Sequence, residues 1–215
     1  MHRFDESLSQ YIVNHSTDVD PLLKELERET YLKIIHPQML SGVIQGKILE
    51  MISSMIKPKN ILELGTFTGY SALCLAKGLK KDGKLITIDI NDELEDFTNS
   101  FFNRSCYKDK IIFKIGDACN IIPYLKEEFD LIFIDADKRQ YTEYYNLVFD
   151  KVKKGGFIIA DNILWYGKVN KEVSKTDLHT KELIKFNKMV NDDPRVENVI
   201  FPIRDGLMVV RKLTD

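Results

Sequence analysis

The chain has 215 residues, a length at which one domain with a single buried core is the natural expectation. Hydrophobic residues make up 44% and charged residues 30% of it, which excludes the low-hydrophobicity, high-charge composition of a disordered chain. Because 31 basic side chains nearly balance 33 acidic ones, no overall charge would attract the protein to nucleic acid or to an anionic membrane.

The first 58 residues are predicted to form helices. Asp5 and Glu6 are followed by no long apolar run, so the start does not resemble a secretory signal, and we expect a cytoplasmic protein without membrane contact. Apolar residues then recur at helical spacing in three groups: Leu8, Tyr11 and Ile12; Leu22, Leu23 and Leu26; and Val43, Ile44, Ile48, Leu49, Ile52 and Met55. The last group ends before Pro58, and we expect all three helices to cover the core that follows.

From residue 61 onward, short apolar runs alternate with segments of helical pattern, which is typical of a parallel sheet covered on both faces. The predicted strands are Ile61–Leu64, Leu85–Ile88, Ile111–Ile115, Leu131–Ile134 and Phe157–Ala160, and none shows polar alternation. The predicted helices between them are Ser71–Leu79, Glu93–Phe102, Ile121–Leu125 and Tyr141–Val152. Gly83 and the Gly155-Gly156 pair are expected to interrupt regular structure.

After the fifth strand, a polar stretch from Trp165 to Asp177 leads into an amphipathic helix that stops near Pro194. Val196–Phe201 and Leu207–Val210 then predict an antiparallel hairpin at the sheet edge. The sequence therefore predicts a doubly wound α/β fold with a mostly parallel, seven-stranded sheet. We place no boundary within residues 1–215, and expect a helical cover over 1–58 and a Rossmann-like core over 59–215.

The segment from residue 60 to residue 71 predicts a strand that runs into a glycine turn and then a helix, an arrangement that lets a ligand approach the backbone. Gly65 and Gly69 flank Phe67, so the G-x-G-x-x-G spacing of dinucleotide sites is absent. Asp89 ends the second strand, where a carboxylate can bind the ribose hydroxyls of NAD or of S-adenosylmethionine. Glu63 adds a carboxylate that suits a cationic sulfonium ligand better. Taken alone, the glycine turn could also be an ordinary connection between a strand and a helix that binds no ligand.

Polar side chains also follow the fourth and fifth strands. Asp135 and Lys138 follow the fourth, and Asp161 and Asn162 follow the fifth. In a doubly wound sheet these strands are expected to be neighbours, with ligands bound outside their carboxyl ends. Two carboxylates and an amide oxygen form a hard ligand set that suits Mg²⁺, with Mn²⁺ or Ca²⁺ as alternatives. The alternative interpretation is that Asp135 and Asp161 only cap the helices that follow them, and that Lys138 is an ordinary lysine at the surface.

Four linked motifs carry a resemblance to a known family: Glu-Leu-Gly-Thr-Phe-Thr-Gly-Tyr-Ser-Ala, Ile-Asp-Ile-Asn, Phe-Ile-Asp-Ala-Asp-Lys and Ala-Asp-Asn. From about Met39 to the carboxyl terminus, the chain resembles the cation-dependent catechol and caffeoyl-CoA O-methyltransferases. The resemblance implies S-adenosylmethionine as methyl donor, a homodimer, metal ligation by Asp135, Asp161 and Asn162, and a base at Lys138. The donor contacts that we expect come from Met39, Glu63, Gly65, Thr66, Ser71, Asp89, Asp117, Ala118 and Asp135.

In the mechanism that we expect, two vicinal oxygens of a hydroxylated aromatic acceptor chelate the cation, which lowers the pKa of one hydroxyl. Lys138 then takes the proton, since the nearby cation helps to keep its amine deprotonated. The acceptor oxygen then attacks the methyl group in line. Trp165 and Tyr166 could stack on a flat acceptor, and Asp205 lies in the final turn. That turn has Arg204 where the family usually has glycine, which predicts a cation beside the acceptor.

Three other functions stay open at this point. The acceptor could be a hydroxyuridine of tRNA, because Lys168, Lys171 and Lys175 form a basic stretch near the expected site. An NAD-dependent oxidoreductase would share the fold and Asp89, and a non-catalytic module could bind the donor without turnover.

Overall fold

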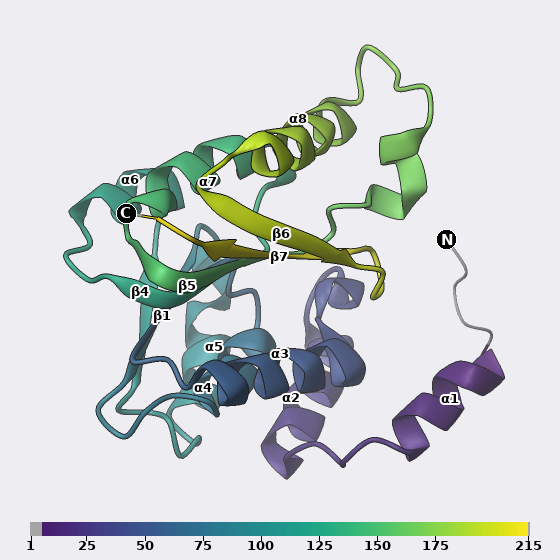
Figure 1. The fold of residues 1–215 in the computed structure, drawn as a ribbon. Helices are drawn as coiled ribbons and strands as arrows, with labels where there is room; N and C mark the ends of the chain where they lie inside the picture. The colour runs from purple at the N-terminus through teal and green to yellow at the C-terminus, as the bar shows by residue number, and fades with distance from the viewer. Residues whose placement is uncertain (1–5, 215) are drawn as a thin grey trace.

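The protein folds around one seven-stranded sheet, which a computed structural model describes over residues 6–214 (Figure 1). The strands are β1 (Asn60–Leu64), β2 (Lys84–Asp89), β3 (Ile111–Ile115), β4 (Phe129–Ile134), β5 (Val152–Ala160), β6 (Val196–Phe201) and β7 (Leu207–Lys212). They lie in the order β3-β2-β1-β4-β5-β7-β6. Neighbours among β1 to β5 are parallel, whereas β7 runs antiparallel to both β5 and β6. The predicted fold class, including the C-terminal hairpin, is confirmed.

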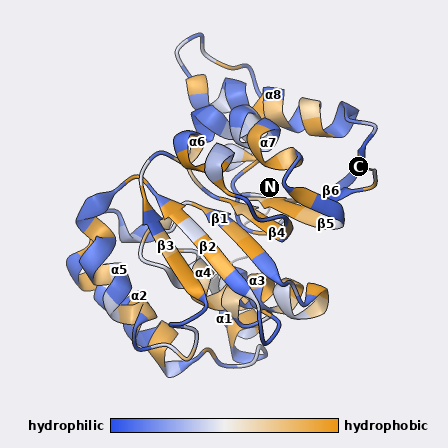
Figure 2. Ribbon diagram, turned by 90° about the vertical axis from the view of Figure 1, so that its left-hand side faces the viewer, coloured by the Kyte–Doolittle hydropathy of each residue, from blue (hydrophilic) through white to orange (hydrophobic). Residues whose placement is uncertain are grey.

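Helices cover both faces of this sheet. The face that carries Ile61, Leu131 and Phe133 packs against α2 (Pro21–Lys33), α3 (Gly42–Ile56), α4 (Tyr70–Ala76) and α5 (Glu95–Phe102). The opposite face packs against α6 (Ala118–Ile121), α7 (Tyr141–Phe149) and α8 (Leu178–Asp192). Figure 2 shows the apolar strands of the sheet between these two helical layers. Because successive strand residues point to opposite faces, a run of apolar residues serves both cores at once.

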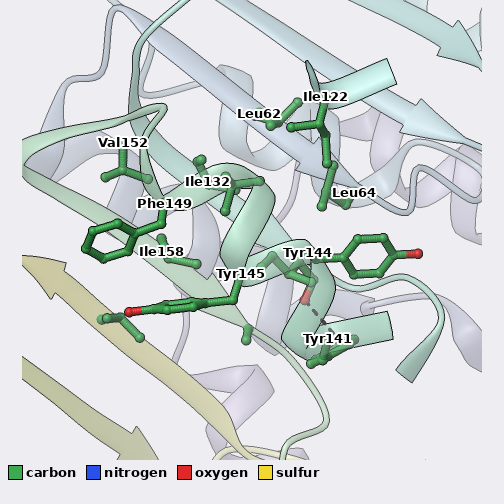
Figure 3. Close-up of a cluster of buried hydrophobic side chains, with 14 of the residues drawn as sticks. Leu62, Leu64, Ile122, Ile132, Tyr141, Tyr144, Tyr145, Phe149, Val152 and Ile158 are labelled. Atoms are coloured by element: carbon green, nitrogen blue, oxygen red, sulfur yellow. Dashed lines mark hydrogen bonds between the residues drawn. The ribbon is translucent and has the colours of Figure 1, made fainter. Parts of the chain in front are cut away.

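The aromatic residues of α7 connect the second core to the strand ends. Tyr141, Tyr144, Tyr145 and Phe149 lie over the sheet beside side chains such as Ile132 (Figure 3). The Tyr141 hydroxyl donates a hydrogen bond of 2.9 Å to the carbonyl oxygen of Asp161, at the end of β5. Packing of α7 therefore fixes the backbone where the polar residues follow the strands.

Short 3₁₀ segments shape the loops: Pro37–Met39, Asp92–Leu94, Ile122–Tyr124, Lys138–Gln140 and Trp165–Asn170. One of them corrects the predicted helix Ile121–Leu125. That helix starts earlier, at Ala118, because Asp117 caps it by accepting a hydrogen bond from the Cys119 amide. It changes to 3₁₀ geometry at Ile122, next to Pro123.

The glycine pair at 155 and 156 was predicted to end regular structure, and this prediction is wrong. Both residues lie inside β5, which begins at Val152. The pairing register with β4 shifts between Phe129 and Leu131, so the strand carries an irregularity at this point. Gly155 accommodates the irregularity with φ +77°, a conformation that few other residues adopt.

The expected helical cover is only partly present. α2 and α3 bury Leu23, Leu26 and Leu49, as predicted. α1 (Glu6–Asn14) instead extends away from the sheet, and Leu8 and Tyr11 remain 41% and 59% exposed (Figure 1). Within residues 6–214, no helix is both long and apolar enough to cross a membrane.

Candidate active site

A large cleft opens at the carboxyl ends of the parallel strands, with a volume of about 2260 Å³. It is the place where ligands bind in open α/β sheets. The predicted site residues that line it are Met39, Gly65, Thr66, Ser71, Asp89, Asp117, Ala118, Asp135, Lys138, Asp161, Asn162, Trp165, Tyr166 and Asp205. Glu63 alone among the predicted residues does not line the cleft, because it is fully buried beneath it.

The turn after β1 forms the floor of one half of the cleft. Gly65 has φ +96°, and a Cβ atom placed there would lie 2.1 Å from the carbonyl oxygen of Asp135. Gly69 has φ +87°, and its Cβ would lie 2.5 Å from the ring of Phe102. Both positions require glycine for backbone conformation and for close packing, which explains the glycine spacing in the sequence.

Asp89 joins this turn to the end of β2. Its Oδ2 accepts a hydrogen bond of 2.7 Å from the Phe67 amide, and its Oδ1 accepts one of 2.9 Å from the Asn91 amide. Phe67 has φ +48°, so the Asp89 carboxylate stabilises an otherwise strained turn. The carboxylate is thereby held in a fixed orientation at the wall of the cleft, which Asp117 and Ala118, shortly after β3, also line.

Glu63 is a buried carboxyl group in the middle of the sheet. Burial, and to a lesser degree the carboxylates of Asp135 and Asp89, raise the pKa of Glu63 to about 8. Thr87 donates a hydrogen bond of 2.5 Å to its Oε2, while Oε1 accepts none from the residues that the structure describes. An acceptor without a partner at this depth is costly, and a cation in the cleft above it would favour the ionised form.

The second half of the cleft holds the predicted metal ligands. Ile134 pairs with Ala160 across β4 and β5, so Asp135 and Asp161 leave the sheet side by side. Asp161 is 3% exposed, and burial together with the charge of Asp135 raises the pKa of Asp161 to about 6. Asn162 follows with φ +58°, a left-handed conformation that asparagine tolerates better than most residues.

These three side chains supply oxygen ligands only. Residues 6–214 contain no group of three or more His, Cys, Asp or Glu side chains that could hold a metal ion. The amide of Asn162 is therefore needed to complete a three-residue set with Asp135 and Asp161. Such a set fits Mg²⁺, Mn²⁺ or Ca²⁺, since zinc prefers histidine and cysteine.

Lys138 lies next to the acidic pair. Its Nζ donates to Asp135 Oδ1 at 2.6 Å and to the carbonyl oxygen of Ala136 at 3.0 Å. Both side chains of this ion pair are largely buried. The amine is thus held at the wall of the cleft beside Asp135.

The remaining wall consists of the loop after β5 and the turn between β6 and β7. The Tyr166 amide donates to Asp205 Oδ1 at 2.6 Å, which ties the two segments together. Trp165 stacks on His179, and Tyr166 is 66% exposed at the mouth. Arg204 lines the cleft as predicted, but its Nη1 is engaged by protein oxygens: the carbonyls of Leu40 and Ser41 and the side chain of Gln45.

Gln45 was not predicted as a site residue. It lies on α3 and is 1% exposed, and its Nε2 donates to Asp161 Oδ2 at 2.5 Å. The 116 residues between the two positions leave no local spacing that could reveal this contact.

Comparison with known proteins gives consistent results. A family model described as O-methyltransferase matches residues 13–213. The caffeoyl-CoA O-methyltransferase of Eucalyptus gunnii is 35% identical over 226 residues, covering 97% of this chain and 88% of that protein. Caffeoyl-CoA O-methyltransferase 5 of Nicotiana tabacum is 34% identical, with 97% and 92% covered.

Solved structures agree with the fold. An O-methyltransferase from Bacillus cereus in complex with SAH (S-adenosylhomocysteine) is 27% identical with a TM-score of 0.88, covering 96% of this chain and 97% of that one. An SAH-bound methyltransferase from Podospora anserina is 26% identical with a TM-score of 0.89, with 100% and 99% covered.

Proposed function

The chain belongs to the O-methyltransferase family, and from this premise we propose that it moves the methyl group of S-adenosylmethionine to a hydroxyl of a catechol-like small molecule with the help of a divalent cation. The observation that carries the proposal is the convergence of Asp135, Asp161 and Asn162 with Lys138 in the same cleft as the glycine turn and Asp89. One half of the cleft then serves the methyl donor and the other the acceptor.

The donor half suits a cationic adenosine derivative. Asp89 presents a fixed carboxylate for the ribose hydroxyls, and the turn at Gly65 offers close approach to the backbone. Asp135 adds negative charge beside the turn, and a cationic ligand would favour the ionised form of Glu63 beneath it. Both effects favour a ligand with a sulfonium and an ammonium group over a dinucleotide. The two SAH-bound relatives carry the demethylated product of such a donor.

The acceptor half fits a hard divalent cation. Asp135 and Asp161 are held together although their like charges oppose ionisation of Asp161, and a cation shared by the two carboxylates would relieve this conflict. Asn162 supplies a third oxygen, and Mg²⁺ is the ion that we propose. A bound cation would supply Lewis acidity, which makes an acceptor hydroxyl easier to deprotonate.

Lys138 is the residue that we propose to hold the acceptor's proton. Asp135 Oδ1 and the Ala136 carbonyl keep its Nζ in place, so the amine needs no rearrangement to reach a bound hydroxyl. Trp165 and Tyr166 would contact a flat acceptor ring at the mouth of the cleft, and Asp205 keeps the Tyr166 backbone in position. Fixed placement of donor and acceptor accounts for most of the rate in this scheme.

The test is a methylation assay with labelled S-adenosylmethionine. A catechol acceptor should be methylated with Mg²⁺, EDTA should abolish turnover, and the Lys138→Ala variant should lower it by roughly 10² to 10⁴. Undiminished activity in EDTA would remove the cation from the proposal. A second arm incubates the enzyme with cell extract divided into small molecules and RNA, and label confined to the RNA pool would reject the small-molecule acceptor.

A homodimer and a cytoplasmic location also stay predictions. The dimer finds support in a shallow apolar hollow on α3 and β6, where Met51, Met55 and Phe201 are exposed. Exposed apolar surface of this kind is typical of contact sites. Light scattering coupled to gel filtration would give the oligomeric state, and a monomer at all concentrations would reject the dimer.

A further inference from the structure

Arg204 has an unusual backbone for its residue type. Its φ is +48°, in the left-handed region that favours glycine. Strained backbone of this kind is concentrated at functional sites, so a strained residue that lines the cleft suggests a functional role for its side chain. This conformation directs the guanidinium from the β6–β7 turn to the segment before α3 and to α3 itself, where it binds protein oxygens.

The contacts of Arg204 fix the orientation of Gln45. Nη1 donates to Gln45 Oε1 at 2.9 Å, and also to the carbonyl oxygens of Leu40 and Ser41. A guanidinium group can only donate hydrogen bonds, so the oxygen of the Gln45 amide must face Arg204. The NH₂ group of that amide must then face the other way.

That other side is occupied by Asp161. Gln45 Nε2 donates to Asp161 Oδ2 at 2.5 Å, while the backbone N–H of Asn162 donates to Asp161 Oδ1 at 2.7 Å. Each carboxylate oxygen therefore has one fixed donor, and the plane of the buried carboxylate is set. An oxygen that accepts one hydrogen bond keeps further acceptor capacity for a cation.

We propose that Arg204 and Gln45 are positioning residues that orient Asp161 as a metal ligand, acting in series as Arg204–Gln45–Asp161. The inference rests on the proposed function, because it assumes that Asp161 binds the cation. Partners behind a ligand fix its geometry, and their loss typically costs tenfold to a hundredfold in metal affinity, about the size of effect to look for. A purely structural clamp between the β6–β7 turn and α3 would leave metal affinity unchanged.

The experiment measures Mn²⁺ affinity by electron paramagnetic resonance, without turnover. Gln45→Met keeps the length of the side chain and removes both polar atoms. Arg204→Ala keeps the backbone strain and removes the guanidinium. Arg211→Ala is the matched control, since Arg211 lies on the same hairpin and forms an exposed ion pair with Glu197.

We expect Gln45→Met and Arg204→Ala to raise the Mn²⁺ Kd about tenfold or more. The control should stay within about twofold of the wild type. Because the residues act in series, the double variant should be no weaker than the more affected single variant, whereas independent effects would add. Titration with SAH checks that each variant is folded, and Arg204→Ala carries the test if Gln45→Met binds no SAH.

The outcomes separate the two proposals. Wild-type protein that binds no Mn²⁺ would overturn the proposed cation site and the inference with it. Wild-type protein that binds Mn²⁺, with variants of unchanged Kd, would overturn the inference alone. Additive losses in the double variant would overturn the series arrangement.

Discussion

Replacing Glu63 by glutamine should change how the stability of the protein depends on pH. Glu63 is fully buried, and its pKa rises from an ordinary value of 4.5 to about 8. The folded protein therefore holds this proton more tightly than the unfolded chain does. Unfolding releases the proton between these two pKa values, so the wild type loses stability as the pH rises through that window.

The size of the effect follows from the two pKa values. Within the window, each pH unit changes the free energy of unfolding by about 1.4 kcal/mol. From about pH 5.5 to about pH 7.5 the wild type should lose roughly 2 to 3 kcal/mol through Glu63, allowing for partial ionisation near pH 8. Glutamine does not ionise, so the variant lacks this loss. Asp161, whose pKa is raised to about 6, titrates in both proteins and cancels in their difference.

Urea unfolding at these two pH values measures the effect. The free energy of unfolding of Glu63→Gln minus that of the wild type should become more positive at the higher pH by roughly 2 to 3 kcal/mol. The control Glu197→Gln changes an exposed ion pair and should give a difference that is the same at both pH values. A pH-independent difference for Glu63→Gln would refute the reasoning, because it would mean that Glu63 does not titrate between its two assigned pKa values.

Outcomes are expected for four further variants. Lys138→Ala should lower kcat by roughly 10² to 10⁴ without changing the affinity for SAH. Calorimetry measures that affinity, and an equal loss of kcat and of SAH affinity would indicate a folding defect. Gly65→Ala should destabilise the protein by about 3 kcal/mol or more, because its Cβ would meet the Asp135 carbonyl at 2.1 Å. Gly155 has a similarly positive φ, but a Cβ there would meet none of the described atoms within 4 Å. Gly155→Ala should therefore lower the free energy of unfolding, measured with urea, by only about 1 kcal/mol. Asp161→Asn should abolish Mg²⁺-stimulated turnover while SAH still binds, and retained stimulation would show that Asp161 is not a ligand.

Much of the fold could be predicted because the parallel strands are apolar on both faces. Runs such as Leu131–Ile134 are buried in two cores at once, so their sequence carries the signal without knowledge of their neighbours. Gly155 misled the prediction for the opposite reason, since its place inside β5 depends on pairing with β4. The exposure of Leu8 and Tyr11 was also unpredictable, because helical periodicity shows an apolar face without showing what covers it.

The candidate site was predictable where its residues directly follow strands. Asp89 ends β2, Asp135 and Asp161 directly follow β4 and β5, and the carboxyl ends of parallel strands lie at one edge of the sheet. Gln45 was missed because it reaches the site from the middle of α3, where a buried polar residue has no special spacing. Arg204 was noticed as a cation near the acceptor, but only the structure shows the oxygens that it binds.

The most direct measurement is a crystal structure of the protein grown with Mn²⁺ and SAH, with the anomalous signal used to locate the metal. Our account predicts one peak within about 2.0–2.6 Å of oxygens from Asp135, Asp161 and Asn162, beside SAH bound between Gly65 and Asp89. SAH in that place with no peak among these three side chains would contradict it.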